Sequence, residues 1–259
     1  MLWAAHIDAA GDISMNDDPV VTGGIFQPSA QVWAGLVNGL RQNSSITRIE
    51  LSIGGDQTSL ANVRSLIGRY GTSSSNPLYV SLQVLNSVLN LDAVNYDDES
   101  EYDPASSTDL ASMCAHLGMH VSMCPYTSQP YWVELVTAIN SKVAAGTADA
   151  VYLQCYDGGA GNDPAQWNDA FKSTGLSIAP GLWATHLQGD PQTCSTSTTA
   201  SQTQTQMRAW AEASSLAGGW MYCGTDMMNC TNGGTPADYA AAILAGLNQV
   251  KSRQRTGSS

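Results

Sequence analysis

The chain has 259 residues, 43% of them hydrophobic, and a formal net charge of −12 with only 10 Lys and Arg. A chain of this length buries one large core, and a single barrel domain of this size is ordinary. The acidic surface argues against nucleic-acid binding, and no apolar run approaches the roughly 18 residues of a membrane span. A neutral polymer such as a glycan is compatible with this composition.

Charged residues make up 12% of the chain, roughly half the usual ~25%. Ser, Thr, Asn, Gln and Gly supply the polarity instead, which indicates a secreted or extracytoplasmic protein, although the chain shows no signal peptide. Cys194 and Cys230 fall in polar loops and are the best candidates for a disulfide. Cys155 falls in an apolar run and is predicted to be a free core residue.

Short β-rich runs alternate with helix-period segments along the whole chain. Strands are predicted at residues 2–7, 46–53, 92–96, 120–124, 150–156, 177–183 and 219–223. Helices are predicted at residues 30–42, 59–70, 77–89, 107–117, 132–145, 164–173, 201–216 and 236–251. This alternation predicts an α/β fold with a parallel sheet, and the polar loops after the strands favour a TIM-type (β/α)8 barrel. We expect residues 1–250 to form one catalytic barrel domain and residues 251–259 to form a polar tail.

The most informative segment is Leu91–Glu99, predicted as a strand in which Asn95, Asp97 and Glu99 face the same way. Three polar groups on one face of an apolar strand must line a cavity, because a dry core would penalise them. Clustered carboxylates also raise one another's pKa, which favours a protonated Glu that acts as an acid. Two other interpretations of these residues stay open: a plain acidic loop, and a divalent-cation site that includes Asp98.

Three motifs resemble those of family 18 glycoside hydrolases, the group of chitinases and endo-β-N-acetylglucosaminidases. Residues 92–99, Asp-Ala-Val-Asn-Tyr-Asp-Asp-Glu, resemble the family's Asp-Gly-x-Asp-x-Asp-x-Glu. Residues 52–55, Ser-Ile-Gly-Gly, are similar to its Ser-x-Gly-Gly, and residues 156–157 resemble its Tyr-Asp pair. The motifs occur in the family's order, each at the end of an apolar run, and cover about residues 55 to 157. The chain departs from the pattern at Ala93 and at Asn95, where the family has Gly and Asp.

The resemblance implies a retaining, substrate-assisted hydrolase of β-linked N-acetylglucosamine glycans, with an N-acetylated glycan as partner and neither cofactor nor metal. Glu99 is then the general acid and base, and Asp97 orients the substrate's acetamido group and offsets developing positive charge. Tyr156 donates a hydrogen bond to the acetamido oxygen. Because Asn95 stands where the family has an Asp, Asp97 lacks an ionisable neighbour. This difference predicts a shifted acid limb in the pH profile of activity.

The resemblance also implies a wider set of substrate-binding residues. Those expected around Asp97 are Ser52, Gly54, Gly55 and Asn95, and those expected around Tyr156 are Gln154 and Asp157. Trp183 or Tyr222 is expected to stack on the sugar, with plain packing an equal alternative for Trp183. Tyr126 is expected to add a further platform, with capping of the helix beneath it an equal alternative. Tyr131 and Trp132 follow the same strand as Tyr126 and suit either a sugar platform or packing on the helix.

Eight parallel strands close such a barrel, and only seven are predicted. We therefore expect the first strand to be absent from this chain, with residues 2–7 resembling the family's second strand; the alternative is that Val20–Phe26 supplies a strand. An open barrel would expose strand edges and favour self-association. No nucleic-acid or membrane partner is expected.

Two further functions stay open. One is a catalytically weak or inactive carbohydrate-binding protein on the same barrel. The other is a metal-dependent hydrolase using Asp97, Asp98 and Glu99, which a chelator would inhibit, although the four His lack metal-ligand spacing.

Overall fold

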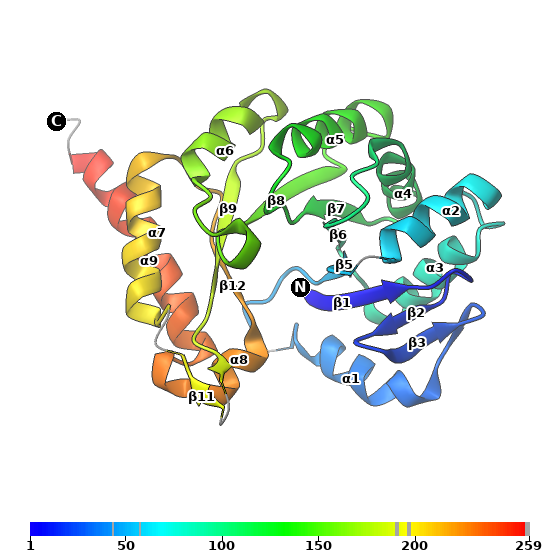
Figure 1. The fold of residues 1–259 in the computed structure, drawn as a ribbon, viewed down its shortest axis with the longest axis horizontal. Coiled ribbons are helices and arrows are strands. Elements are labelled where there is room, and N and C mark those ends of the chain that lie inside the picture. Colours follow the sequence, from blue (N-terminus) through cyan, green and yellow to red (C-terminus); the bar gives the residue numbers. More distant parts are fainter. Residues whose placement is uncertain (43, 57, 190–191, 196–197, 257–259) are drawn as a thin grey trace. The chain divides into compact units, whose positions relative to one another are not determined.

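The structure is a computed structural model that describes residues 1–42, 44–56, 58–189, 192–195 and 198–256. Its internal contacts divide the chain into two compact units. Unit 1 comprises Met1–Cys124 and Pro130–Asp149, and unit 2 comprises Pro125–Gln129 and Ala150–Ser259. Figure 1 labels the elements of both units, which are described separately.

Unit 1 is built on four parallel strands, β1 (Leu2–Ile7), β5 (Glu50–Gly54), β6 (Ala93–Asp97) and β7 (His120–Met123). They pair in the order β1-β5-β6-β7. Every residue of β5 and β6 is buried, as expected for parallel strands covered on both faces. This double burial explains why the strands stand out in the sequence as apolar runs.

A short antiparallel arm follows β1 in the chain. It consists of β2 (Ile13–Met15), β3 (Asp18–Thr22) and β4 (Ile25–Phe26), drawn in blue in Figure 1. β2 pairs with β1 through Ala5, His6 and Ile7, and β3 pairs with β2 and β4. The segment Val20–Phe26 therefore belongs to an antiparallel arm, so the alternative that it supplies a parallel barrel strand is wrong.

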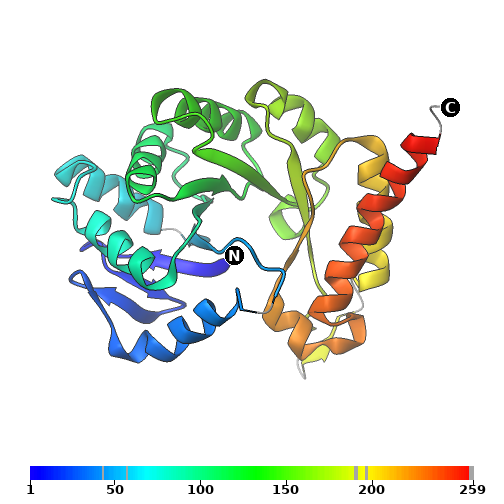
Figure 2. The ribbon, with the colours of Figure 1, turned by 180° about the vertical axis from the view of Figure 1, so that it is seen from behind.

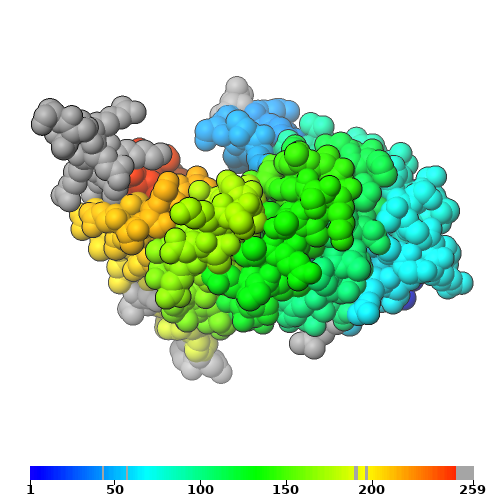
Figure 3. Space-filling view, turned by 90° about the horizontal axis from the view of Figure 1, so that it is seen from above, coloured from blue at the N-terminus to red at the C-terminus, as the bar shows by residue number. Residues whose placement is uncertain are grey.

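Five helices accompany these strands: α1 (Gln31–Gly39), α2 (Ser59–Tyr70), α3 (Pro77–Leu89), α4 (Pro104–His116) and α5 (Gln129–Lys142). A single turn, η1 (Pro28–Ala30), precedes α1. The starts of α3 and α4 follow from local chemistry, because Asn76 and Asp103 cap them and a Pro occupies the first helical position of each. The outer surfaces of α4 and α5 appear in teal and green in Figure 3.

Unit 2 contains the parallel strands β9 (Ile178–Trp183) and β12 (Trp220–Tyr222) together with most of β8 (Ala148–Gln154), which begins in unit 1. β9 pairs with both β8 and β12. The helices are α6 (Pro164–Phe171), α7 (Ala200–Ala213), α8 (Gly224–Asn229) and α9 (Pro236–Thr256). α7 and α9 lie side by side in both ribbon views (Figures 1 and 2).

The loops of unit 2 carry smaller elements: the hairpin β10 (Leu187–Gln188) and β11 (Thr193–Cys194), and the turns η2 (Asp157–Gly159), η3 (Lys172–Thr174) and η4 (Thr231–Gly233). A disulfide joins Cys194 to Cys230, the pair expected from the sequence, and Cys155 is a free, half-buried cysteine. α9 continues to Thr256, so residues 251–256 of the expected tail are helical, and residues 257–259 lie outside the described part.

The fold is α/β, with a mostly parallel sheet whose strands alternate with helices along the chain. The described residues contain seven parallel strands, which correspond to the seven predicted ones. This strand-helix alternation is that of a TIM-type barrel. Among the described residues, no helix has the length and apolar character that crossing a bilayer requires.

Candidate active site

Asp97 is the last residue of β6, and several polar side chains of unit 1 lie around it. It is 5% exposed, and the indole Nε1 of Trp3 donates a hydrogen bond to its Oδ2 at 3.0 Å. The backbone N–H of Gly55 donates to its carbonyl oxygen at 2.9 Å. Asp97 is therefore held at the carboxyl end of the strand, its carboxylate by Trp3 of β1 and its backbone carbonyl by Gly55 after β5.

The two glycines of residues 54–55 make this arrangement possible. Gly54 has a φ of +112°, and a Cβ added there would lie 2.2 Å from the carbonyl oxygen of Asp97. Gly55 has a φ of +68°, and its Cβ would lie 3.1 Å from both Asp97 Oδ2 and Trp3 Nε1. Only glycine suits a left-handed backbone that approaches another strand so closely. The Ser-x-Gly-Gly motif is thus explained by the space that Asp97 and Trp3 need.

Beneath Asp97, Asn95 is completely buried and its side-chain amide is hydrogen-bonded at both ends. Its Oδ1 accepts from Ser52 Oγ at 2.9 Å, and its Nδ2 donates to Ser122 Oγ at 2.8 Å. Ser52 and Ser122 are also 0% exposed, and Ser122 donates in turn to Glu50. Ser52 and Asn95, predicted as neighbours under Asp97, are brought together here, whereas the sequence analysis did not single out Ser122 or Glu50.

Glu99 lies in a bend after β6 and its side chain is exposed. The prediction that the strand continues to Glu99 is therefore wrong. The cause is Asp98, which is 2% exposed and accepts the N–H groups of Ser100, Glu101 and Tyr102 at 2.9–3.2 Å. These bonds turn the chain directly after Asp97, so Glu99 is carried by an anchored loop rather than by a strand.

Asp98 also accepts a hydrogen bond from the hydroxyl of Tyr131 at 3.1 Å, and Tyr131 packs edge-on against Trp132. Trp132 is 1% exposed, so these two aromatic residues are packing and anchoring groups, as one of the two expectations held. The carboxylate of Asp98 is committed to the loop backbone. In the described part of the chain, no three His, Cys, Asp or Glu side chains are grouped so that they hold a metal ion.

Unit 2 gathers aromatic side chains at the carboxyl ends of β8, β9 and β12. Tyr156 stacks on Tyr222 with a centroid distance of 5.5 Å and an interplanar angle of 12°. Trp220 and Trp183 contact the Tyr156 ring at 5.7 and 6.2 Å. The structure therefore brings three predicted residues, Tyr156, Trp183 and Tyr222, into one aromatic cluster.

Trp220 is a member of this cluster that the sequence analysis missed. Its indole ring lies over Gly181, where an added Cβ would be 2.1 Å from the ring, and its Nε1 donates to the carbonyl of Ala179 at 3.1 Å. A glycine within a buried strand is the sequence signal for such a close approach. Gly181 could have pointed to a large neighbour on β12.

Trp183 is held in place by two polar neighbours. Its Nε1 donates to Asp226 Oδ2 at 2.8 Å, and the His186 ring stacks on it with a centroid distance of 3.9 Å. Cys223 lies 3.4 Å from the same Asp226 oxygen, and burial together with the nearby Asp226 raises the pKa of the Cys223 thiol. The orientation of the Trp183 indole is thus fixed, and His186 covers one of its faces.

The remaining predicted residues of unit 2 surround the loop after β8. Gln154 is 8% exposed, and its carbonyl accepts from Asn162 Nδ2 at 2.9 Å. The same amide nitrogen donates to the carbonyl of Tyr126 at 2.8 Å, so Asn162, which the sequence analysis missed, ties two loops together. A Cβ on Gly158 would lie 3.1 Å from the Tyr126 ring, and Asp157 is exposed at the start of η2.

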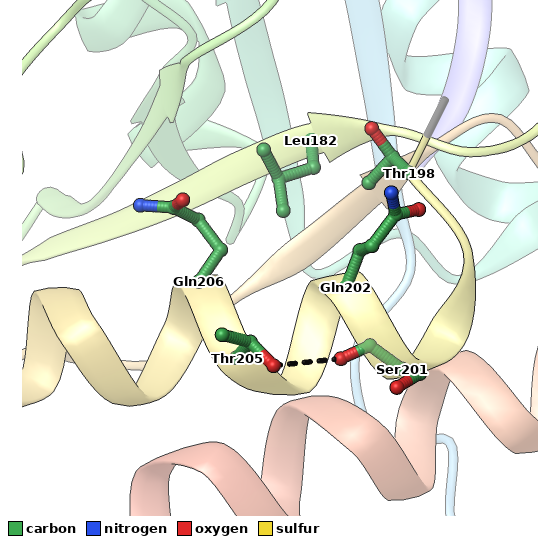
Figure 4. Close-up of a pocket in the computed structure, with 6 residues that line it drawn as sticks. All are labelled: Leu182, Thr198, Ser201, Gln202, Thr205 and Gln206. Atoms are coloured by element: carbon green, nitrogen blue, oxygen red, sulfur yellow. Dashed lines mark hydrogen bonds between the residues drawn. The ribbon is translucent and has the colours of Figure 1, made fainter. Parts of the chain in front are cut away.

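An open pocket of about 380 Å³ lies between β9 and α7 (Figure 4). It is lined by Leu182, Thr198, Ser201, Gln202, Thr205 and Gln206. None of these residues is charged or aromatic, and none is a predicted site residue. Because side chains alternate along a strand, Leu182 and Trp183 project from opposite faces of β9, so this pocket belongs to the helix-facing side.

Comparison with known proteins supports the fold. No family model and no curated protein matches the sequence. Among solved structures, the C-terminal domain of ChiA from Legionella pneumophila is similar with a TM-score of 0.54 at 14% identity, over 86% of this chain and 88% of that one. A family 18 chitinase from Crocus vernus is similar with a TM-score of 0.52 at 13% identity, over 93% and 87% of the two chains. The chain therefore has a family 18 chitinase-like glycoside hydrolase fold.

Proposed function

We propose that this chain is a retaining, substrate-assisted glycosidase that acts on β-linked N-acetylglucosamine glycans. The observation that carries the proposal is the placement of Asp97 at the end of β6, held by Trp3 and Gly55, with Glu99 following in a loop anchored by Asp98. This placement supports the roles that the motif resemblance of residues 92–99 implies for Asp97 and Glu99. The fold of the chitinases described above supports the same assignment.

The proposed chemistry assigns a step to each group. Glu99 protonates the leaving glycosidic oxygen while the substrate's acetamido oxygen attacks the anomeric carbon, which gives an oxazolinium ion. Asp97 accepts the acetamido N–H and offsets the positive charge that develops on the ring. Glu99 then removes a proton from the water that opens the oxazolinium ion, so the anomeric configuration is retained.

Tyr156 enters the proposal through the Tyr-Asp motif and through its surroundings in unit 2. Its stacking on Tyr222 limits the orientations of the ring, and its hydroxyl is the proposed donor to the acetamido oxygen. The indole of Trp183, fixed by Asp226, suits a sugar-stacking role. Gln154, Asp157 and Tyr126 remain proposed substrate contacts on the neighbouring loop.

The substitution Glu99→Gln tests the proposal. It should lower turnover at least about 100-fold, because general acid–base groups contribute roughly that much, while a thiazoline analogue of the intermediate still binds. Glu101→Gln is the matched control, because Glu101 lies in the same loop and makes an ion pair with Arg64 near the surface, which contributes little. Substrates to screen are chitooligosaccharides, peptidoglycan and a high-mannose N-glycan.

Unchanged turnover in the Glu99→Gln variant would contradict the proposed role of Glu99. Sugar binding by the unaltered protein without turnover on any of the glycans would favour the alternative of an inactive carbohydrate-binding protein.

We also propose that the protein is exported. Its disulfide and its low content of charged residues support an oxidising compartment outside the cytosol. Thiol titration of the unfolded protein from its native source checks this: four thiols are expected, since two of the six Cys are paired. Six thiols would contradict export.

A further inference from the structure

A buried polar row crosses three strands of unit 1 beneath Asp97. Ser52 of β5 is in register with Asn95 of β6, and Asn95 is in register with Ser122 of β7. All three residues are 0% exposed. Glu50, two residues before Ser52 on the same face of β5, is 3% exposed and accepts a hydrogen bond from Ser122. The row therefore ends on a buried carboxylate.

The hydrogen bonds of this row all point in one direction. A serine hydroxyl carries a single hydrogen, and Ser122 donates it to Glu50. Ser122 therefore presents a lone pair to Asn95, whose Nδ2 donates to it, and the opposite end of the amide accepts from Ser52. This polarity needs an acceptor at position 50 and a donor at position 95. Together they leave Asn95 with one orientation of its amide.

Arg48 holds the carboxylate of Glu50 at the far end of the row. It donates to Glu50 and makes two hydrogen bonds of 2.7 Å to the two oxygens of Asp149. Burial alone would lower the pKa of Arg48, but its hydrogen bonds to Asp149 and Glu50 and its attraction to both raise it above its ordinary value. The negative charge of Glu50 is thus compensated by Arg48 rather than by Asn95.

We propose that Glu50 is a positioning residue that, through Ser122, fixes the amide of Asn95 beneath Asp97. The resembling family has an Asp at the position of Asn95 on β6. In this chain the buried carboxylate is instead Glu50, on the neighbouring strand β5. The proposal rests on the proposed function of Asp97, and it adds a residue that lies outside every recognised motif. Glu50 is proposed to act on the reaction indirectly, through Ser122 and Asn95.

A double-substitution cycle tests the direction of the row. In Asn95→Asp, a carboxylate faces the lone pair of Ser122, so the new acid is stable only when protonated. In Glu50→Gln/Asn95→Asp, the new amide at position 50 donates to Ser122, and the Ser122 hydrogen turns to the new carboxylate at position 95. Every group of the row then has a partner again. Arg48 keeps its two bonds to Asp149 in both variants, which favours folding.

The expected results separate this mechanism from simple damage. We expect Glu50→Gln to lower kcat about tenfold with KM changed less than about twofold, and Asn95→Asp to lower kcat about 100-fold. The double variant should recover at least about tenfold over Asn95→Asp, because the two sites are coupled. Adding Glu134→Gln, a change on exposed Glu134 of α5, to Asn95→Asp should give no recovery. A double variant no more active than Asn95→Asp would overturn the proposal.

Two readouts do not depend on glycosidase activity, so they decide the proposal even if no glycan is hydrolysed. The side-chain amide signal of Asn95, assigned in NMR spectra by its loss in Asn95→Asp, should shift and exchange faster with water in Glu50→Gln. An unmoved signal would overturn the proposal.

The second readout is stability against pH. The new acid of Asn95→Asp faces Ser52 and Ser122, with Glu50 behind Ser122, and Asp97 is the next residue on the same face of β6. We expect these buried neighbours to raise the folded-state pKa of the new acid. The free energy of unfolding of the Asn95→Asp variant should therefore fall as pH rises from about 4 to 8, and this fall should vanish in Glu50→Gln/Asn95→Asp. An equal fall of the free energy of unfolding in both variants would contradict the proposed link from Glu50 through Ser122 to position 95.

Discussion

The hydrogen bond from Trp3 to Asp97 gives a direct test of the site in unit 1. Trp3→Phe removes the indole N–H and keeps an aromatic ring in β1. The donor lies 3.0 Å from Asp97 Oδ2, and Asp97 is 5% exposed whereas Trp3 is 42% exposed. A hydrogen bond to a charged group contributes about 1.5–3 kcal/mol. Water reaches the exposed indole side, so we expect the lower end, about 1.5 kcal/mol, or roughly a tenfold loss of kcat/KM.

The assay is steady-state hydrolysis of the best glycan substrate, with the Kd of a thiazoline inhibitor measured in parallel. If Asp97 acts on the transition state, Trp3→Phe weakens thiazoline binding along with kcat, since both depend on the position of the carboxylate. Trp33→Phe in α1 is the control for a tryptophan-to-phenylalanine change elsewhere in unit 1. Values for Trp3→Phe within twofold of the unaltered protein would refute the role given to this hydrogen bond.

Three further predictions concern stability, measured by urea unfolding. Gly54→Ala places a Cβ 2.2 Å from the Asp97 carbonyl oxygen and should lower the free energy of unfolding by more than about 3 kcal/mol. Gly68→Ala, in an open position of α2, is the control and should be neutral or stabilising by up to about 1 kcal/mol. Equal effects of the two substitutions would contradict the crowding argument. Replacing Cys194 and Cys230 by Ser opens a cross-link spanning 36 residues and should cost about 4 kcal/mol, and a loss below about 1 kcal/mol would count against it. Hydrogen bonds from Ser106 lower the pKa of Asp103, so its stabilising effect is present at neutral pH and is lost as pH falls through the lowered value. The stability difference between the unaltered protein and Asp103→Asn should therefore shrink in acid, and a difference that grows would refute it.

The regular elements of this chain could be predicted because their physics is local. Strands such as β6 and β9 are buried on both faces and therefore form apolar runs, and the helices between them keep a 3.6-residue period. α2 and α3 have the predicted bounds. The hairpin β10–β11 was missed, and the antiparallel arm was considered only as one possible barrel strand at residues 20–26. Strands of two to five residues carry too little pattern to separate them from loops.

The candidate site was only partly predictable, for a different reason. The motifs located Asp97, Glu99 and Tyr156 because their residues are close in sequence. Trp3 contacts Asp97 across 94 positions of the chain, and nothing in its spacing distinguishes it from a core aromatic residue of a strand. The boundary at Glu99 failed because strict alternation was extended past Asp98, whose carboxylate turns the chain through three backbone N–H groups. A distant tertiary partner decided the first point, and a local turn at Asp98, which strand periodicity does not reveal, decided the second.

The departure at Asn95 and the contact with Trp3 have a common chemical consequence. A neutral amide below Asp97 adds no charge that would oppose ionisation, and an indole N–H on Oδ2 favours the charged carboxylate. Substrate assistance requires that charged form, because the oxazolinium ion is positive. A motif with two acids can reach it by sharing a proton between them, whereas this chain reaches it with one acid, one amide and one donor. The acid limb of its activity should then need no second acid at position 95, and a limb that depends on two protonations would show that another acid takes the place of the missing one.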